Sequence, residues 1–348
     1  MSSGASISKI VIGTRKSDLA LWQAYAVRDA LQASNVSCEI LGVSTLGDRV
    51  QNVPLSAFSD KGVFTKELDV ALLDNTCQIA VHSMKDLPTT LPEKLTLAAV
   101  IPRGAVRDCL VIHPTHLKNG VRTLEDLSNA VSLVNKDGSN DNKPVIGTSS
   151  VRRRALLQRA YPNTFDIREC RGNLNTRTRK LDEAQFDAIV LAEAGLERLG
   201  WQNRLNYLLP LSSFPHAAAQ GVVAVVAHED NAEVLEACKR ITCARTLLRV
   251  HSERMMLKSL EGGCKVPVAC ASAWTSKDGS DTDELSLHGV VVSPDGTAVA
   301  EFHGSRECHT LDDSGALGEL VAEQLRQQGA TAILDAVRAS ASGSAASS

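Results

Sequence analysis

Val11-Ile12-Gly13-Thr14 and Val145-Ile146-Gly147-Thr148 are two copies of one short pattern. Each copy is followed by hydroxyl and cationic residues, Arg15-Lys16-Ser17 in the first and Ser149-Ser150-Val151-Arg152-Arg153 in the second, and then by an amphipathic segment. The pattern predicts a strand, a glycine turn and the start of a helix, where unpaired backbone N–H groups and a partial positive charge bind anions. Two such helix starts predict two similar lobes that hold one polyanionic ligand. Chance similarity of two ordinary strand-helix turns is the alternative.

Outward from these copies, short β-branched runs alternate with amphipathic stretches, which is typical of an α/β sheet flanked by helices. Strands are expected at 10–12, 79–81 and 187–192. Helices are expected at 19–31, capped by Ser17 or Asp18, and at 64–73. The polar segment 135–144 should be a surface loop, and the small polar residues from Ser340 to Ser348 should be disordered.

The length of 348 residues exceeds what one hydrophobic core supports and predicts two or three domains. A net charge of −3 gives no global attraction to nucleic acid or membrane, so anion binding must come from local clusters. One cluster is dense in cations and contains only Asp166 and Glu169 as acids: Arg152, Arg153, Arg154, Arg159, Arg168, Arg171, Arg177, Arg179 and Lys180.

This arginine run has three interpretations. Most charge runs are solvated helix faces. Its position after Gly147-Thr148-Ser149-Ser150 favours carboxylate binding, because the planar guanidinium makes two parallel hydrogen bonds. A nucleic-acid module is the weakest interpretation, since the chain has three Trp, three Tyr and six Phe and none interleaves with the run.

The nine cysteines form no CxxC pair and their number is odd, which predicts reduced thiols and a cytoplasmic location. The first residues resemble neither a signal peptide nor a transit peptide, and no run of 18 apolar residues occurs, so we expect no membrane association. Cys264 differs from the others, because Gly262-Gly263-Cys264-Lys265 sets its thiol beside glycines and a cation that favours the reactive thiolate. A small buried hydrophobe is the alternative.

Asp86 is the one acid in His82-Ser83-Met84-Lys85-Asp86, at the expected end of a strand. Flanked by cations it should stay ionised, and it could hold N–H donors or a developing cation. A helix cap or surface ion pair is the alternative. His113 and His116 stand close together without a nearby acid or thiolate, and we predict no metal site.

Together these residues resemble one family, the porphobilinogen deaminases or hydroxymethylbilane synthases, from about Ile7 to Val337. Its motifs occur here in one order: Gly13-Thr14-Arg15-Lys16-Ser17, Ala20-Leu21-Trp22-Gln23-Ala24, Lys61-Gly62-Val63-Phe64-Thr65-Lys66-Glu67-Leu68, Val81-His82-Ser83-Met84-Lys85-Asp86, Gly147-Thr148-Ser149-Ser150-Val151-Arg152-Arg153, Arg171-Gly172-Asn173 and Leu260-Glu261-Gly262-Gly263-Cys264.

The resemblance implies a transferase that joins four porphobilinogen molecules head to tail, releases ammonia, and frees hydroxymethylbilane for haem biosynthesis. Cys264 would anchor a dipyrromethane cofactor through a thioether. Asp86 would contact pyrrole N–H groups and stabilise the cationic species left when ammonia departs. Each pyrrole carries an acetate and a propionate, so the growing chain needs many carboxylate partners.

The same resemblance assigns those partners. The cofactor-binding residues would be Cys264, Lys85, Ser83, Arg152, Arg153, Ser149 and Thr148. The substrate-binding residues would be Arg15, Ser17, Gln23, Arg171, Arg177, Arg198, Ser150, Lys61 and Phe64, the last two in a loop near the cleft. A monomer that passes its product to uroporphyrinogen-III synthase is also expected.

The family fold is α/β with three domains, the first two resembling the lobes of periplasmic binding proteins. This maps domain 1 to 7–102 plus 222–240, domain 2 to 103–216 and a smaller cofactor-anchoring α+β domain 3 to 244–340, followed by a disordered tail at 341–348. One segment departs from the family pattern, with Ala219 in place of a glycine and Val226 in place of an acid. If Ala219 adopts a positive φ, the strain costs roughly 1 kcal/mol. A two-lobed binding protein for small anions remains the alternative function.

Overall fold

The structure is a computed structural model that describes residues 9–45, 65–134, 142–260, 266–275 and 284–345. These residues divide into two compact units, which we describe one at a time. Unit 1 comprises the chain up to Gly104 together with Ala219–Leu248, and unit 2 comprises Ala105–Ala218 and the chain from Arg249 onward.

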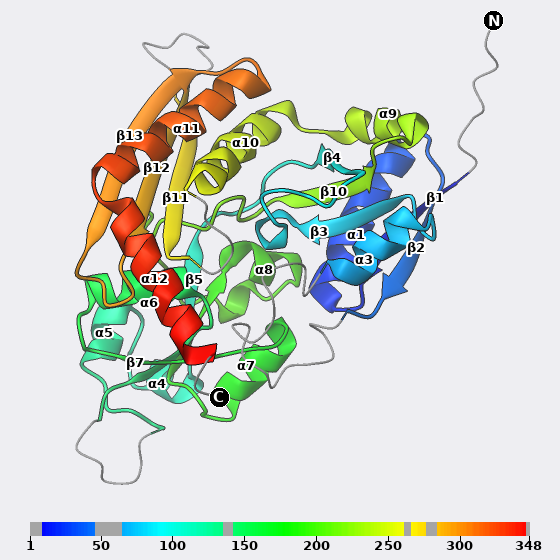
Figure 1. Ribbon diagram of the computed structural model, residues 1–348. Helices are drawn as coiled ribbons and strands as arrows, with labels where there is room; N and C mark the ends of the chain where they lie inside the picture. The colour runs from blue at the N-terminus through cyan, green and yellow to red at the C-terminus, as the bar shows by residue number, and fades with distance from the viewer. Residues whose placement is uncertain (1–8, 46–64, 135–141, 261–265, 276–283, 346–348) are drawn as a thin grey trace, which may run out of the picture. The chain divides into compact units, whose positions relative to one another are not determined.

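Unit 1 is built on a five-stranded sheet in the order β2-β1-β3-β10-β4 (Figure 1). The neighbours β2 and β3 both run parallel to β1, whereas β10 is antiparallel to β3 and β4. The strands are β1 (Ile10–Arg15), β2 (Cys38–Val43), β3 (Ile79–Ser83), β4 (Leu95–Val100) and β10 (Val223–His228). The strands expected at 10–12 and 79–81 are confirmed.

Helix α1 (Asp18–Ala33) begins where the sequence indicated, because the Ser17 side chain accepts a hydrogen bond from the backbone N–H of Ala20. Apolar residues at helical spacing, including Ala24, Val27 and Leu31, are buried against the sheet. The remaining helical elements lying wholly in unit 1 are α3 (Lys66–Leu73), η2 (Met84–Asp86) and α9 (Ala232–Ile241). Helix α3 confirms the expected helix over its described part, which excludes Phe64.

Unit 2 contains a second five-stranded sheet, in the order β7-β6-β8-β5-β9. Strands β7 and β8 run parallel to β6, and β5 is antiparallel to β8. The arrangement repeats that of unit 1, with β6 in the place of β1, so the two copies of the Val-Ile-Gly-Thr pattern occupy equivalent strands. The strands are β5 (Asp108–Ile112), β6 (Val145–Gly147), β7 (Asp166–Arg168), β8 (Ala188–Ala192) and β9 (Tyr207–Leu208).

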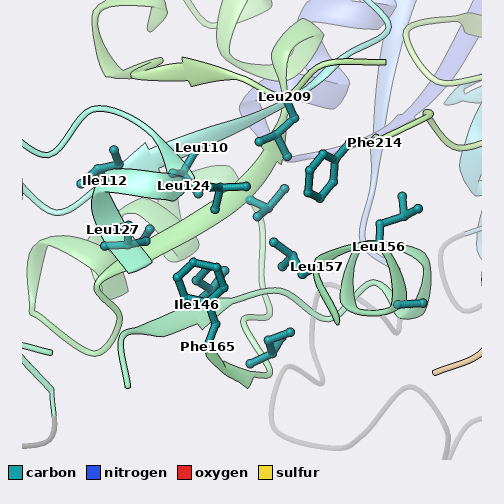
Figure 2. Close-up of a cluster of buried hydrophobic side chains, with 14 of the residues drawn as sticks. Leu110, Ile112, Leu124, Leu127, Ile146, Leu156, Leu157, Phe165, Leu209 and Phe214 are labelled. Atoms are coloured by element: carbon teal, nitrogen blue, oxygen red, sulfur yellow. The ribbon is translucent and has the colours of Figure 1, made fainter. Parts of the chain in front are cut away.

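Short helices accompany this second sheet, and an apolar core lies between them. Figure 2 shows Leu110 and Ile146 from the strands beside Leu156 and Leu157 from α6, which all belong to one buried cluster. The helical elements are α4 (Pro114–Lys118), α5 (Leu124–Ser128), α6 (Val151–Ala160), α7 (Leu174–Asp182), α8 (Glu193–Arg198) and η3 (Gln202–Arg204).

The C-terminal part of unit 2 is a three-stranded antiparallel sheet in the order β11-β12-β13. Helix α11 packs closely on it, since a Cβ at Gly289 would lie 2.7 Å from the Val321 side chain. Figure 1 shows α11 running along β12 and β13. Helix α10 (Ala244–Ser259) begins in unit 1 and ends in unit 2. The elements wholly in this part of unit 2 are β11 (Val268–Thr275), β12 (Glu284–Val292), β13 (Val299–Glu307), α11 (Leu311–Gln327) and α12 (Ala330–Ala345).

One local expectation stays a prediction and another is corrected. Of the tail at 341–348, which was expected to be disordered, α12 includes the residues up to Ala345, and 346–348 lie outside the described residues. Gly13 and Gly147 were expected in ligand-facing turns, but both lie within strands. A Cβ there would meet Cys77 Sγ at 2.7 Å and the Phe186 ring at 2.8 Å, so these glycines permit close packing.

The expected α/β class is confirmed, with two similar sheet-based lobes and a smaller third sheet. Among the described residues, no helix is both long and apolar enough to cross a membrane.

Candidate active site

One edge of the unit 1 sheet collects most of the residues expected around Asp86. Strands β1 and β3 are parallel, so their carboxyl ends lie at the same edge, which is where open α/β sheets bind ligands. β10 is antiparallel to β3, and the segment before β10 therefore reaches this edge too. The structure thus brings together Arg15, Ser17, Gln23, Ser83, Lys85, Asp86 and Gln220.

Hydrogen bonds between side chains fix this edge. The buried Gln23 amide donates to Ser83 Oγ at 2.8 Å, which joins α1 to the end of β3. The hydroxyl of buried Thr14 donates to the Ala20 carbonyl at 3.1 Å. Ser17 caps α1, with Oγ 3.4 Å from the Ala20 nitrogen. The hydroxyls at this edge therefore have defined structural partners.

Lys85 is held by a residue that the sequence did not single out. Its Nζ lies 3.3 Å from Gln220 Oε1, and the Gln220 side chain is buried. The Gln220 carbonyl accepts a hydrogen bond from Arg103 Nε at 2.9 Å. The only feature of the sequence that could have pointed to Gln220 is its place as a polar residue after three alanines, Ala217-Ala218-Ala219. Gln220 thus positions the cation next to Asp86.

Asp86 is the last residue of the single turn η2, and its side chain is exposed. Its neighbours Met84 and Leu87 are buried, and the Leu87 N–H donates to the Met84 carbonyl. Within the described residues, no hydrogen bond or ion pair reaches the Asp86 carboxylate. Among the described residues, Asp86 is therefore neither a helix cap nor a member of a surface ion pair. The apolar anchors on either side present an uncommitted carboxylate to solvent.

His82, four residues before Asp86, is buried in β3. Burial lowers the pKa of His82 from 6.5 to about 4, and the nearby Arg15 charge adds to this effect. Its Nε2 has no hydrogen-bond partner among the described residues. The ring is therefore neutral at physiological pH and adds no positive charge near Asp86.

The equivalent edge of the second sheet carries the hydroxyls and arginines that follow β6. Ser150 caps α6 by accepting from the Arg153 N–H at 3.4 Å. The Ser149 hydroxyl donates to the Cys170 carbonyl at 2.9 Å. Thr148 is buried, and its hydroxyl accepts from the Ser150 N–H. The three residues form the predicted helix start.

Arg152 and Arg153 are buried, with 5% and 6% of their surface exposed, so the solvated-face interpretation is wrong for them. Both form ion pairs of 2.7 Å with the carboxylate of Asp108, which is fully buried. Arg152 also donates to the Pro215 carbonyl, and Arg153 to the Val190 carbonyl. Burial lowers the pKa of Arg152, and the Asp108 charge opposes that effect.

In each of these two guanidinium groups one buried nitrogen is left without a partner. The Nε atoms of Arg152 and Arg153 are buried and have no hydrogen-bond partner among the described residues. An unpaired buried donor is costly and native proteins rarely keep one without a reason.

Other members of the arginine run have separate partners. Arg171 forms two 3.0 Å hydrogen bonds with Glu169, and Arg177 Nε donates to the Gly172 carbonyl at 2.7 Å. Arg198 lies beyond the run, on α8 after β8; it is partly buried, and this burial lowers its pKa. Exposed members form surface pairs, such as Arg179 with Glu183. The run is therefore part buried and part solvated face.

Three predicted site residues, Cys264, Lys61 and Phe64, lie outside the described residues. The histidines considered as metal ligands are used otherwise, since His116 Nε2 bonds to Asp187 at 2.8 Å and His113 accepts from the Thr115 N–H. Sequence reasoning missed Asp108. The sequence signal that could have found Asp108 is its position at the start of an apolar strand. An acid there is buried, and a buried charge requires a partner of opposite charge.

Comparison with known proteins identifies the family. The model of the porphobilinogen deaminase dipyromethane cofactor binding domain matches residues 10–236, and that of the porphobilinogen deaminase C-terminal domain matches residues 247–327. The porphobilinogen deaminase of Gloeobacter violaceus is 40% identical over 94% of this chain and 93% of its own length. That of a Nostoc species is 41% identical over 94% of both chains.

Among solved structures, the periplasmic VFT2 domain of Bordetella pertussis BvgS is similar at 14% identity and a TM-score of 0.39, over 68% of this chain and 88% of its own. This likeness is too remote to bear on the site. The family models and the sequence relatives agree along nearly the whole chain. The chain belongs to the porphobilinogen deaminase family.

Proposed function

We propose that this chain condenses four porphobilinogen molecules into hydroxymethylbilane with release of ammonia, and that Asp86 is its catalytic carboxylate. The main support for this proposal is the position of Asp86 in a chain of this family. Its exposed carboxylate follows β3 at the carboxyl ends of the parallel strands β1 and β3 and has no partner among the described residues. Such a carboxylate can accept a pyrrole N–H and oppose the positive charge that develops on the substrate as ammonia leaves. The neutral His82 behind it leaves this charge balance undisturbed.

The cofactor of the family is dipyrromethane. When bound, it supplies the pyrrole carbon that attacks the first substrate. The described residues fit a carboxylate-bearing group, because Arg152 Nε and Arg153 Nε are buried donors that await an acceptor. We propose that these two residues, with Lys85, Ser83, Thr148 and Ser149, hold the cofactor carboxylates, and that Cys264 is the covalent anchor.

Substrate carboxylates need a second set of partners. We propose Arg15, Arg171, Arg177 and Arg198 as their cations, with Ser17, Ser150 and Gln23 as neutral donors and Lys61 and Phe64 as contacts from the preceding loop. Arg171 would exchange its Glu169 partner for substrate, which is feasible because the Glu169 side chain is 52% exposed and can move into solvent, while that of Arg171 is 15% exposed.

Intact-mass measurement of the purified chain tests the proposal. We expect an adduct of two porphobilinogen units less their ammonias, together with hydroxymethylbilane formation. Cys264→Ser should abolish both, because the alcohol is far less ionised than the thiol at neutral pH. Cys38→Ser is the matched control and should leave both unchanged.

The rival function, a two-lobed binding protein for small anions, predicts no adduct and no product. An unmodified mass together with reversible binding of porphobilinogen would favour that rival. Full turnover by Cys264→Ser would overturn the anchor assignment alone.

Three finer points belong to the same proposal. We propose the three domains with the boundaries given above, supported by the three separate sheets. We propose a monomer in the cytosol, in keeping with the absence of any disulfide among the eight described cysteines. Hand-off of the product to uroporphyrinogen-III synthase follows from the product's role, and light scattering of the two mixed proteins would test it.

A further inference from the structure

The C-terminal sheet gathers two imidazoles and a carboxylate on one face. His288 on β12 lies directly opposite His303 on β13 in the strand register. Glu301 is two residues from His303, so it shares the same face of β13. Nitrogen and oxygen atoms of the three side chains all lie within 4.8 Å of one another.

These side chains already interact in an ordered way. The two imidazole rings stack, with centroids 3.7 Å apart and planes 8° apart. His288 Nε2 lies 2.9 Å from Glu301 Oε1, and Arg159 of α6 forms a 3.0 Å ion pair with Glu301 Oε2. Glu301 therefore uses its two oxygens differently, one toward the rings and one toward the cation.

His303 offers ring nitrogens to solvent. Its side chain is exposed, and within the described residues it makes no hydrogen bond or ion pair beyond the stack with His288. An imidazole nitrogen is the commonest protein ligand for a metal ion.

We propose that His288, Glu301 and His303 form a binding site for a divalent transition-metal ion, with Zn²⁺ the best match to two nitrogens and one carboxylate oxygen. Water would complete a tetrahedral site, in which ligand atoms lie roughly 3.4 Å apart. Because the lone pair of each ring nitrogen lies in the ring plane, the exposed His303 ring would have to turn out of the stack with His288 for both nitrogens to reach one ion. Arg159 would stay on Oε2 as an outer partner that orients the carboxylate.

A second group of potential ligands, His216, Glu253 and Cys270, lies elsewhere in unit 2. All three are fully buried, and Cys270 Sγ is 3.7 Å from His216 Nδ1. Glu253 accepts a 2.5 Å hydrogen bond from the Ser272 hydroxyl. We prefer the first group, because Glu301 and His303 give an ion a path from solvent. The thiol of the second group makes the two distinguishable by spectroscopy.

Titration of the full-length, cofactor-bearing protein with ZnCl₂ after dialysis against EDTA tests the proposal. We expect one equivalent bound in calorimetry and a rise of several degrees in melting temperature near saturation. His303→Ala and Glu301→Gln should each weaken binding at least 10-fold, because loss of even an outer partner of a metal ligand typically costs about 10- to 100-fold in affinity. The matched control is His309→Ala, which removes an exposed histidine two residues after the end of β13.

Co²⁺ substitution identifies the ligands. Coordination by nitrogen and oxygen gives only weak visible bands, whereas a thiolate adds intense charge-transfer absorption. Unchanged affinity in His303→Ala, intense thiolate absorption, or no heat above that of buffer would each overturn the proposal. Since His303 is exposed, its variant should keep the metal-free melting temperature of the wild type, which separates lost binding from lost folding.

Discussion

The two five-stranded sheets share one strand order but treat charge at their carboxyl edges in opposite ways. In unit 1 the acid, Asp86, is exposed and uncommitted. In unit 2 the acid, Asp108, is fully buried between two arginines. The first edge leaves its acid without a partner among the described residues. The second neutralises its acid internally, and two buried arginine Nε donors there have no partner among the described residues.

The difference has an energetic side. An exposed carboxylate contributes little to folding, so its replacement should change chemistry rather than stability. A buried ion pair contributes little net stability as a whole, yet removal of one partner leaves an uncompensated charge. Substitutions at the two acids should therefore separate catalysis from stability.

Asp108→Asn should give the largest effect. We expect the free energy of unfolding to fall by about 3 to 5 kcal/mol, because Arg152 and Arg153 would remain buried without a counter-charge. Urea denaturation followed by circular dichroism measures this. Asp182→Asn, which breaks the partly exposed pair with Arg204, is the control and should cost less than about 1 kcal/mol. Equal losses in the two variants would mean that burial at Asp108 is unimportant.

Asp86→Asn should leave the unfolding free energy unchanged but reduce turnover on the order of 10²-fold, equivalent to about 3 kcal/mol. The amide can still accept a pyrrole N–H but cannot oppose positive charge. Asp86→Glu should retain measurable activity, because it displaces the charge by about one carbon-carbon bond.

Steady-state product formation with cofactor-loaded enzyme measures both Asp86 variants, so that failed cofactor assembly is not mistaken for failed catalysis. A fully active Asn variant beside an inactive Glu variant would show that Asp86 acts by shape, and the role assigned to its charge would be wrong.

His82 should make unit 1 sensitive to acid. Its pKa is about 4 when folded and 6.5 ordinarily, so between these values the unfolded chain binds a proton that the folded chain does not. Stability therefore falls as pH falls through this window, by about 2 kcal/mol between pH 6.5 and pH 5. Denaturation of wild type and His82→Phe at pH 7 and pH 5 isolates this contribution. Parallel losses in the two proteins would argue against a neutral buried His82.

Ala219→Gly should give the smallest effect. Ala219 has φ +60°, and the strain of about 1 kcal/mol that glycine relieves is offset by loss of a buried methyl group worth about 0.8 kcal/mol. We expect a net change within about 0.5 kcal/mol. Ala218→Gly, at ordinary φ, should cost about 1 kcal/mol by chemical denaturation. A loss at Ala219 as large as at Ala218 would mean that its backbone is unstrained.

Much of the fold was accessible from local sequence patterns. Strand β1, helix α1 and the cap at Ser17 followed from apolar periodicity and a hydroxyl at the helix start, which are local properties. The function of Gly13 was not accessible, because the close approach of Cys77 joins residues far apart in the sequence. The continuation of α12 to Ala345 was not predicted, because Ala-Ser-Gly-Ser-Ala is small and polar and carries no strong helix signal.

The candidate site shows the same division. Residue identities and their order pointed to the family and to Asp86. Which arginines are buried was not predictable, because Arg152 and Arg179 belong to the same basic run and differ only in tertiary surroundings. The partners Asp108 and Gln220 lie 44 or more positions from the cations they contact, and a single sequence carries no record of such pairings.

Strand β10 has a consequence for how the chain acquires its structure. It sits in the middle of the unit 1 sheet, yet it comes after every strand of the second five-stranded sheet. During synthesis β3 and β4 must wait for residues 223–228, leaving their edges unpaired, while β5 to β9 can pair with one another earlier. The lobe that begins first along the chain is thus completed second. Pulse-labelled hydrogen exchange during synthesis or refolding would detect this order as earlier protection of amides in β5 and β8 than in β4.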